Sequence, residues 1–257
     1  MNILVCIKQV PDMESKFKIS SDGQWYDQSD LTFKINEYDE YAIEEAVRLK
    51  EKLGNAEVVA LSIGPERTKE VIRKALAIGI DKGVHVLDND SHEKDPLQIA
   101  TIIANYAKDK NFDIVFLGMQ SQDRASAQVG PILSELLGYN CVTTIVGFEH
   151  QESKVNVKRE LEGGIKAKIS VKLPVILTCQ LGLNTVRYPT LPNIMKAKKK
   201  ELNTINVNDL LNEQPKVVNL QAYIPEKKKG GILLEGKADE VADKLISILK
   251  EKTQVLR

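Results

Sequence analysis

The stretch that decides the fold runs from residue 57 to residue 87 and reads EVVALSIGPERTKEVIRKALAIGIDKGVHVL. It begins and ends with short apolar runs rich in β-branched residues, 57–63 and 84–87, which are typical of buried strands. Between these runs, the apolar residues of 66–78 recur at helical spacing. A strand, a helix and a second strand in this order predict two parallel strands joined by a right-handed helical crossover.

The same alternation continues on both sides of this unit. Short apolar runs lie at 3–7 and 114–117, and stretches with helical spacing occupy 38–53, 96–106 and 125–137. Residues 1 to about 145 therefore predict an α/β fold with a doubly wound, mostly parallel sheet. Helices cover both faces of such a Rossmann-like sheet, and one type of this fold binds adenine nucleotides at the carboxyl ends of the strands.

After about residue 145 the strands follow one another without helices between them. The candidates are 154–159, 167–171 and 175–180, with a turn at Glu162-Gly163-Gly164. They predict a β-hairpin extension of the sheet. Residues 201–236 have weak periodicity, typical of an extended arm, and an apolar stripe between 238 and 249 predicts a final helix.

We therefore expect a nucleotide-binding domain over 1–185, and over 186–257 a docking loop followed by an arm that ends in a helix. An amphipathic helix on a long arm cannot easily cover its own apolar face, which favours packing against another chain. The alternative, that the arm folds back onto its own domain, stays open.

The composition excludes the extreme classes of protein. The chain has 257 residues, 36 Lys plus Arg against 36 Asp plus Glu, 28% charged and 42% hydrophobic residues. A balanced charge gives no overall attraction to nucleic acid or to an anionic membrane. The apolar run at the start is too short for a signal sequence or a membrane span, so we expect a cytoplasmic protein without membrane insertion.

Motifs for bond-making chemistry are absent from the sequence. The three cysteines, Cys6, Cys141 and Cys179, are scattered through apolar stretches without a CxxC pair, so we expect buried packing residues and no metal site. The three histidines lie in no recognisable nucleophile or metal motif. We found neither GxSxG, GxGxxG nor a P-loop, and we do not expect this chain to be an enzyme on its own.

Three junctions between strands and helices are candidates for ligand binding. They are Cys6 to Val10, Ser62 to Pro65 and Gly118 to Gly130, and all three follow strands at the same edge of the predicted sheet. The last junction carries small and hydroxyl residues into a helix, whose free N–H groups and positive dipole end suit a phosphate. Together the junctions fit a nucleotide, although each alone is also consistent with an ordinary helix cap.

A second candidate is the stretch from Tyr188 to Lys200. It places apolar residues, among them Leu191 and Met195, between two prolines and a run of lysines. An apolar knob beside a basic run is typical of a surface that docks a partner. A solvated lysine face on a helix that packs on the core is the alternative.

Several segments carry a resemblance to a known family. They are Val5 to Asp12, Asn36 to Ala46, Arg73 to Gly79, Arg159 to Gly164, and Arg187 to Lys200. Over essentially its whole length the chain resembles the β subunit of electron transfer flavoprotein. The last two segments are the most specific.

The resemblance implies a heterodimer with an α subunit that holds most of a redox-active FAD, and an AMP in the β subunit. The implied nucleotide contacts are Cys6, Asn36, Glu37, Tyr38, Asp39, Ile63, Gly118, Met119, Gln120, Ser121, Gln122, Asp123, Arg124, Ala125, Ser126, Ala127, Gln128 and Val129. The implied docking loop contains Leu191, Pro192, Ile194, Met195 and Lys196, with Leu191 as the anchor.

The implied activity is electron transfer from acyl-CoA or related dehydrogenases, as in fatty-acid β-oxidation, toward a quinone oxidoreductase. The run Ser126 to Pro131 also resembles members of the family that bifurcate electrons, oxidise NADH and bind a second FAD in place of AMP. Arg124 and Ala125 depart from the Gly-Asp of many of those members, and Glu37 replaces a frequent proline. We expect AMP, with the second FAD as the alternative.

Overall fold

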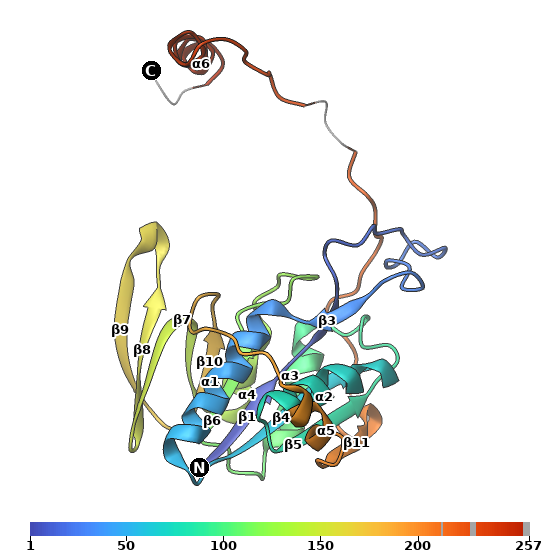
Figure 1. Cartoon of the computed structure of the whole chain (residues 1–257). Helices are drawn as coiled ribbons and strands as arrows, with labels where there is room; N and C mark the ends of the chain where they lie inside the picture. Colours follow the sequence, from blue (N-terminus) through green and yellow to red (C-terminus); the bar gives the residue numbers. More distant parts are fainter. Residues whose placement is uncertain (212, 227–229, 254–257) are drawn as a thin grey trace. The chain divides into compact units, whose positions relative to one another are not determined.

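The structure is a computed structural model that describes residues 1–211, 213–226 and 230–253 (Figure 1). The chain divides into two units, Met1–Ala222 and Tyr223–Arg257. The first unit contains a nine-stranded sheet with helices on both faces. This confirms the predicted α/β fold class.

The elements have the following bounds. The strands are β1 (Asn2–Cys6), β2 (Gln9–Pro11), β3 (Phe33–Ile35), β4 (Glu57–Gly64), β5 (Lys82–Leu87), β6 (Ile114–Gly118), β7 (Asn140–Gln151), β8 (Lys154–Glu160), β9 (Lys166–Lys172), β10 (Val175–Cys179) and β11 (Leu202–Asn206). The helices are α1 (Glu37–Leu53), α2 (Lys69–Ile78), α3 (Pro96–Ala107), α4 (Val129–Leu137), α5 (Leu191–Ala197) and α6 (Ala238–Lys252), with short 3-10 turns at Glu66–Thr68, Glu162–Gly164 and Val207–Asp209.

The strand order of the large sheet is β11-β5-β4-β1-β6-β10-β7-β8-β9. All pairs from β11 to β7 are parallel, and β7-β8-β9 is an antiparallel extension. From β1 the chain moves outward through β4 and β5, then returns to place β6 on the other side of β1. The topological switch point therefore lies between β1 and β6, where open sheets of this kind bind ligands.

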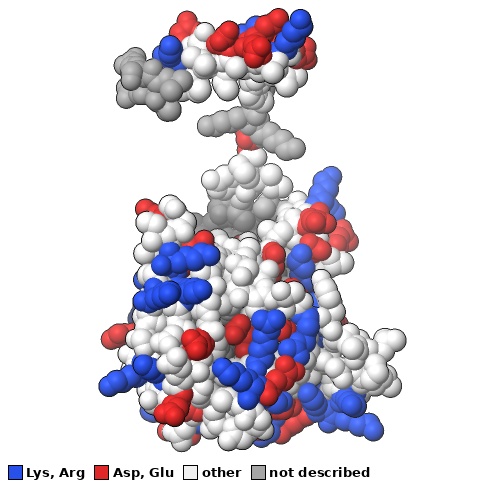
Figure 2. Space-filling view, turned by 60° about the vertical axis from the view of Figure 1, so that its left-hand side comes forward, with Lys and Arg blue, Asp and Glu red and all other residues white. Residues whose placement is uncertain are grey.

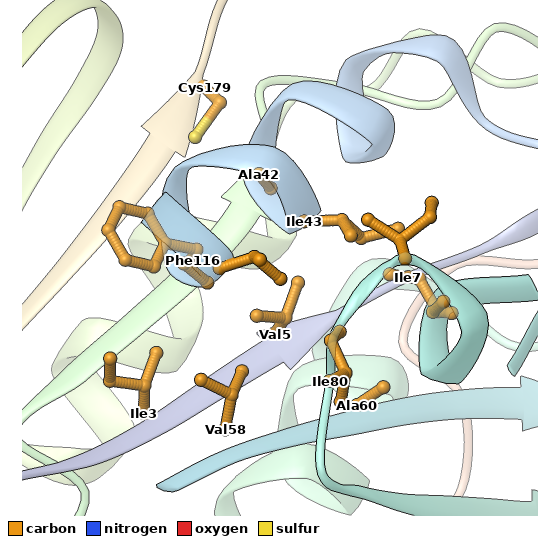
Figure 3. Close-up of a cluster of buried hydrophobic side chains, with 14 of the residues drawn as sticks. Ile3, Val5, Ile7, Ala42, Ile43, Val58, Ala60, Ile80, Phe116 and Cys179 are labelled. Atoms are coloured by element: carbon orange, nitrogen blue, oxygen red, sulfur yellow. The ribbon is translucent and has the colours of Figure 1, made fainter. Parts of the chain in front are cut away.

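The hydrophobic core has two layers because successive side chains of a buried parallel strand point to opposite faces. On β1, Ile3 and Val5 belong to the layer under α1 and α2, whereas Leu4 and Cys6 belong to the layer under α3 and α4. Figure 3 shows the first layer, where side chains of β1, β4, β6 and α1 meet. These layers hold the carboxyl ends of β1, β4 and β6 in one row.

Some of the sequence-based expectations were wrong. The helix expected from 125 begins only at Val129, because Ala125 and Ala127 have left-handed φ angles of 50° and 52° that interrupt it. Strands β8 and β9 form the expected hairpin at the edge of the sheet, but the third strand candidate is β10, which lies inside the sheet between β6 and β7. Strand β7 was not predicted, and the segment expected as an extended arm begins with β11, which pairs with β5.

The distribution of charged residues on the surface and the burial of the cysteines are as expected from the sequence. Figure 2 shows Lys and Arg interspersed with Asp and Glu on one face of the molecule. Cys6 and Cys179 are buried and Cys141 is half-buried, all three with free thiols. Among the described helices, none combines the length and the apolar character that a membrane crossing requires.

The second unit, Tyr223–Arg257, contains helix α6. No side chain of α6 is buried, and its apolar stripe includes the exposed Leu245 and Ile246. The expected arm also includes residues 212, 227–229 and 254–257, which lie outside the described residues.

Candidate functional site

A pocket lies at the carboxyl ends of β1, β4 and β6, next to the topological switch point. Its walls also include the segment between β2 and β3, the loop before α3, and the residues that lead into α4. The three junctions singled out in the sequence all contribute to this one pocket, through residues such as Cys6, Ile63 and Gly118.

Asp39 ties two of these strand ends together. One oxygen of its buried carboxylate accepts a 2.7 Å hydrogen bond from the backbone N–H of Lys8, and the other accepts a 2.9 Å bond from the N–H of Gly118. A Cβ at Gly118 would lie 2.2 Å from the Asp39 carboxylate, so only glycine fits this approach. The first turn of α1 thereby fixes the floor of the pocket.

Asn36, directly before α1, holds the loop after β6. Its side-chain amide donates to the carbonyl oxygen of Gln120 at 2.8 Å, and its side-chain oxygen accepts from the N–H of Gln122 at 3.0 Å. Both hydrogen-bonding groups of this buried side chain are satisfied by backbone, which makes Asn36 a specific clamp. Residues 36–39 therefore shape the loop from 118 to 122.

The residues that lead into α4 form an end of the pocket that is suited to an anion. The pocket lining includes Ser126, Ala127, Gln128 and Val129, where the chain enters the helix. The first N–H groups of a helix have no intrahelical acceptor, and the helix dipole places partial positive charge there. Gly130 lets this turn approach β10 closely, since a Cβ would lie 2.4 Å from Thr178.

Two of the cationic side chains that line the pocket form ion pairs with carboxylates, and two arginines do not. Lys8 pairs with Asp123 at 2.7 Å, and Lys94 lies 3.5 Å from Asp88. Within the described part of the chain, neither Arg67 nor Arg124 forms an ion pair, although both line the pocket. Two uncompensated guanidinium groups beside a helix start are suited to a phosphorylated ligand.

Burial controls the ionisation of the groups at the floor. It raises the pKa of the Asp39 carboxyl to about 7, although the N–H groups of Lys8 and Gly118 favour the charged form. Burial also raises the pKa of the Cys6 thiol, with a smaller contribution from Asp39. Cys6 is therefore a protonated packing residue rather than a nucleophile.

The docking candidate at 188–200 lies on the other face of the sheet from α4. Helix α5 packs on α2, and the Thr190 hydroxyl accepts from the N–H of Asn193 at 3.4 Å. Leu191 is 79% exposed, and Met195 is exposed as well. The large apolar side chains Leu191 and Met195 therefore face outward, whereas Ala197 at the end of the helix is buried in the core.

Two salt bridges hold the chain directly before this helix. The guanidinium of Arg187 is 2.8 Å from the Glu44 carboxylate and 2.6 Å from that of Glu51. The Glu44 side chain is almost fully buried, so Arg187 stabilises a charge that would otherwise be costly. These contacts join the docking candidate to α1, the helix that also shapes the pocket.

Comparison with known proteins identifies the family. Residues 25–210 match the model of the electron transfer flavoprotein domain. The chain is 40% identical to the electron transfer flavoprotein subunit beta of Bacillus subtilis, over all of both chains. It is 36% identical to the mouse protein of the same name, over 94% of this chain and 96% of the relative. The chain belongs to the electron transfer flavoprotein β-subunit family. Its role is thus that of a β subunit in an electron transfer flavoprotein, which implies pairing with an α subunit.

Most nucleotide contacts expected from the resemblance to electron transfer flavoprotein lie around the pocket. Those that line it are Cys6, Asn36, Asp39, Ile63, Gly118, Met119, Gln120, Ser121, Asp123, Arg124, Ser126, Ala127, Gln128 and Val129. Four others, Glu37, Tyr38, Gln122 and Ala125, do not line it. Glu37 and Tyr38 instead accept hydrogen bonds from the Gln122 and Gln120 side chains, at 2.9 and 3.3 Å.

Sequence reasoning missed Trp25 and Arg67 among other pocket residues, whereas Lys8 lies within the candidate junction Cys6 to Val10. Arg67 lies just beyond the candidate junction Ser62 to Pro65, at a position where a cation is common on any protein surface. Trp25 lies between β2 and β3, in a stretch without periodicity. The single signal for it is that the only tryptophan of the chain occurs in a polar segment.

Proposed function

We propose that this β subunit binds AMP in the pocket beside the switch point, while the redox-active FAD is held mainly by the α subunit. The observation that carries the AMP assignment is the pair of uncompensated arginines, Arg67 and Arg124, at a pocket that also contains the start of α4. The phosphate fits the positive end of the pocket. Apolar lining residues such as Ile63, Ile99 and Ile103 are suited to the base.

Within this proposal, the FAD supplies the electron-carrying chemistry when it is bound. The contribution of this chain is to pack on the α subunit that holds the FAD and to dock the electron donor. The amphipathic helix α6 of the arm, which buries none of its side chains, packs on the α subunit. The AMP serves as a structural ligand that stabilises the loops around it, since a ligand that binds only the folded state stabilises that state.

We infer that α5 and the residues around it dock the electron donor, an acyl-CoA dehydrogenase or a related enzyme, and that electrons then pass to a quinone oxidoreductase. Leu191 is the anchor, because a large, exposed apolar side chain on a short, capped helix can enter a pocket of a partner. The exposed lysines at 196, 198 and 199 aid encounter with an acidic partner surface.

A pair of matched variants tests the docking role. In the heterodimer, Leu191→Ala should slow the second-order rate of flavin reduction by the dehydrogenase at least about tenfold, the loss typical of a central interface anchor. The control is Leu136→Ala, which truncates a 46% exposed leucine on α4, across the sheet from α5. Flavin content should be unchanged in both variants. Equal rates for Leu191→Ala and the wild type would remove the assignment.

A further inference from the structure

The segment between β2 and β3, residues 12–32, forms one wall of the pocket through Trp25, Tyr26 and Gln28. It has little regular structure apart from a bridge between Ile19 and Tyr26. The rings of Trp25 and Tyr26 lie 4.8 Å apart, and Phe17 contacts Tyr26 edge to face at 5.5 Å. The aromatic side chains therefore fix the position of the Trp25 indole.

The segment is also fastened from outside. The N–H of Ala222 donates to the carbonyl oxygen of Gly23 at 2.8 Å, and the Gln24 side chain donates to the carbonyl oxygen of Leu220 at 3.4 Å. These bonds hold the residues directly before Trp25. The wall is thus anchored on two sides before any ligand binds.

Trp25 is in direct contact with Arg124, from the loop that leads into α4. The guanidinium carbon of Arg124 lies over the indole, 4.6 Å from the ring centroid. The guanidinium also donates to the carbonyl oxygens of Lys94, at 3.4 Å, and of His92. An aromatic face and two carbonyl groups orient the guanidinium without neutralising its charge.

The neighbouring carboxylate does not neutralise it either. Asp123 precedes Arg124 in the chain, but its two oxygens both lie 2.7 Å from the Lys8 ammonium. Arg124 is thus a fixed positive group on the pocket wall, two residues before the loop enters the start of α4 at 126–129.

We propose that Trp25 is a positioning residue of the nucleotide site: its indole holds the Arg124 guanidinium where this group pairs with the phosphate of the bound nucleotide. The proposal rests on the proposed AMP site and extends it to a segment that carries no recognisable motif. Trp25 acts here through Arg124. The indole is already in contact with the Arg124 guanidinium and with the rings of Tyr26 and His92.

The test compares two replacements of Trp25 that differ in aromaticity. Trp25→Phe keeps an aromatic face for Arg124, whereas Trp25→Leu keeps an apolar side chain without one. For each variant heterodimer, the bound nucleotide is removed, and the affinities for AMP and for adenosine are then measured by calorimetric titration. The same titrations are made on Arg124→Gln and on Trp25→Leu combined with Arg124→Gln. Unchanged flavin absorbance and circular dichroism establish that each variant is folded.

We expect Trp25→Leu to weaken AMP binding about threefold to tenfold, the range that a cation–π contact supports. Trp25→Phe should stay close to the wild type, and adenosine binding should be the same in all variants. In the Arg124→Gln background, Trp25→Leu should have no further effect, because the two residues act as one unit.

Three results would overturn the proposal. They are equal AMP affinities for Trp25→Leu and Trp25→Phe, an equal loss for adenosine and AMP, or additive effects of Trp25→Leu and Arg124→Gln. A wild-type heterodimer that binds no AMP would instead refute the proposed function itself, so the two failures are distinguishable.

Discussion

The guanidinium of Arg73, on helix α2, donates a 2.8 Å hydrogen bond to the carbonyl oxygen of Ala197, the last residue of helix α5. The same guanidinium donates to the carbonyl oxygen of Lys200, also at 2.8 Å. In return, the Lys200 ammonium donates to the carbonyl oxygens of Leu76 and Ile80 at the end of α2, at 2.9 and 2.5 Å. Each helix end is therefore capped by a cation from the other segment. Lys200, part of the lysine run, has this structural task in place of a free surface role.

This reciprocal capping predicts the effect of Arg73→Met. The variant leaves two carbonyl oxygens without their donor, and hydrogen bonds to charged groups contribute about 1.5–3 kcal/mol each. We expect a lower unfolding midpoint of the heterodimer and a slower reduction by the dehydrogenase, because α5 loses its fixed position. The control is Lys74→Met, one residue further on α2, which removes a partly exposed ion pair with Glu40 at 2.9 Å. If Arg73→Met and Lys74→Met had the same unfolding midpoint and the same rate of reduction by the dehydrogenase, the capping account would be wrong.

The raised pKa of the Asp39 carboxyl predicts that the stability of the protein depends on pH. Its pKa of about 7 lies above the ordinary value of 3.8, so the folded chain holds this proton more tightly than the unfolded chain. The contribution of Asp39 to stability is therefore greatest below that ordinary value and declines as the pH rises through 7. The slope is at most about 1.4 kcal/mol per pH unit.

The comparison for this prediction is Asp39→Asn, which has no proton to release. Urea unfolding of both heterodimers is followed at several pH values between about 5.5 and 8, the window below and above the raised pKa. Titrations of groups that do not interact with Asp39 are shared by both proteins and cancel in the difference. The wild type should lose more stability than the variant over this window, and parallel curves would contradict the raised pKa.

Gly118→Ala tests how tightly the floor of the pocket is built. The added methyl group would meet the Asp39 carboxylate at 2.2 Å and the Tyr38 Cβ at 2.7 Å, so backbone or helix must move. We expect a loss of about 1–3 kcal/mol in stability together with weaker AMP binding. Gly54→Ala is the matched control, since its positive φ of 74° costs strain but nothing lies within 4 Å. If AMP binding by Gly118→Ala equals that of the control, the floor is not part of the site.

An element of the fold can be predicted from the sequence where a local pattern determines it. It cannot be predicted where contacts distant in the sequence determine it. Strands β1, β4, β5 and β6 are predictable because they are buried on both faces and read as mostly apolar runs. Strand β11 is not, because Leu202–Asn206 is a largely polar edge strand whose pairing with β5 stabilises it.

The pocket also combines features that follow from local sequence patterns with features that depend on long-range contacts. Its strand ends were found from the alternation of strands and helices, because parallel strands bring their carboxyl ends to one edge. Trp25 comes from a segment without a pattern, and Arg67 from the first turn of a helical pattern that carries no sign of ligand binding. Long-range contacts bring both residues to the pocket. The late start of α4 follows from the left-handed Ala125 and Ala127, although alanine is by itself a good helix former.

The most direct test of the account is the nucleotide content of the purified heterodimer. Acid release followed by chromatographic separation and counting of FAD and AMP requires no variant and no partner enzyme. We predict one FAD and one AMP per heterodimer. Two FAD without AMP would contradict the account and favour an electron-bifurcating flavoprotein, and a heterodimer with FAD but without any nucleotide in the β subunit would refute the assignment of the pocket.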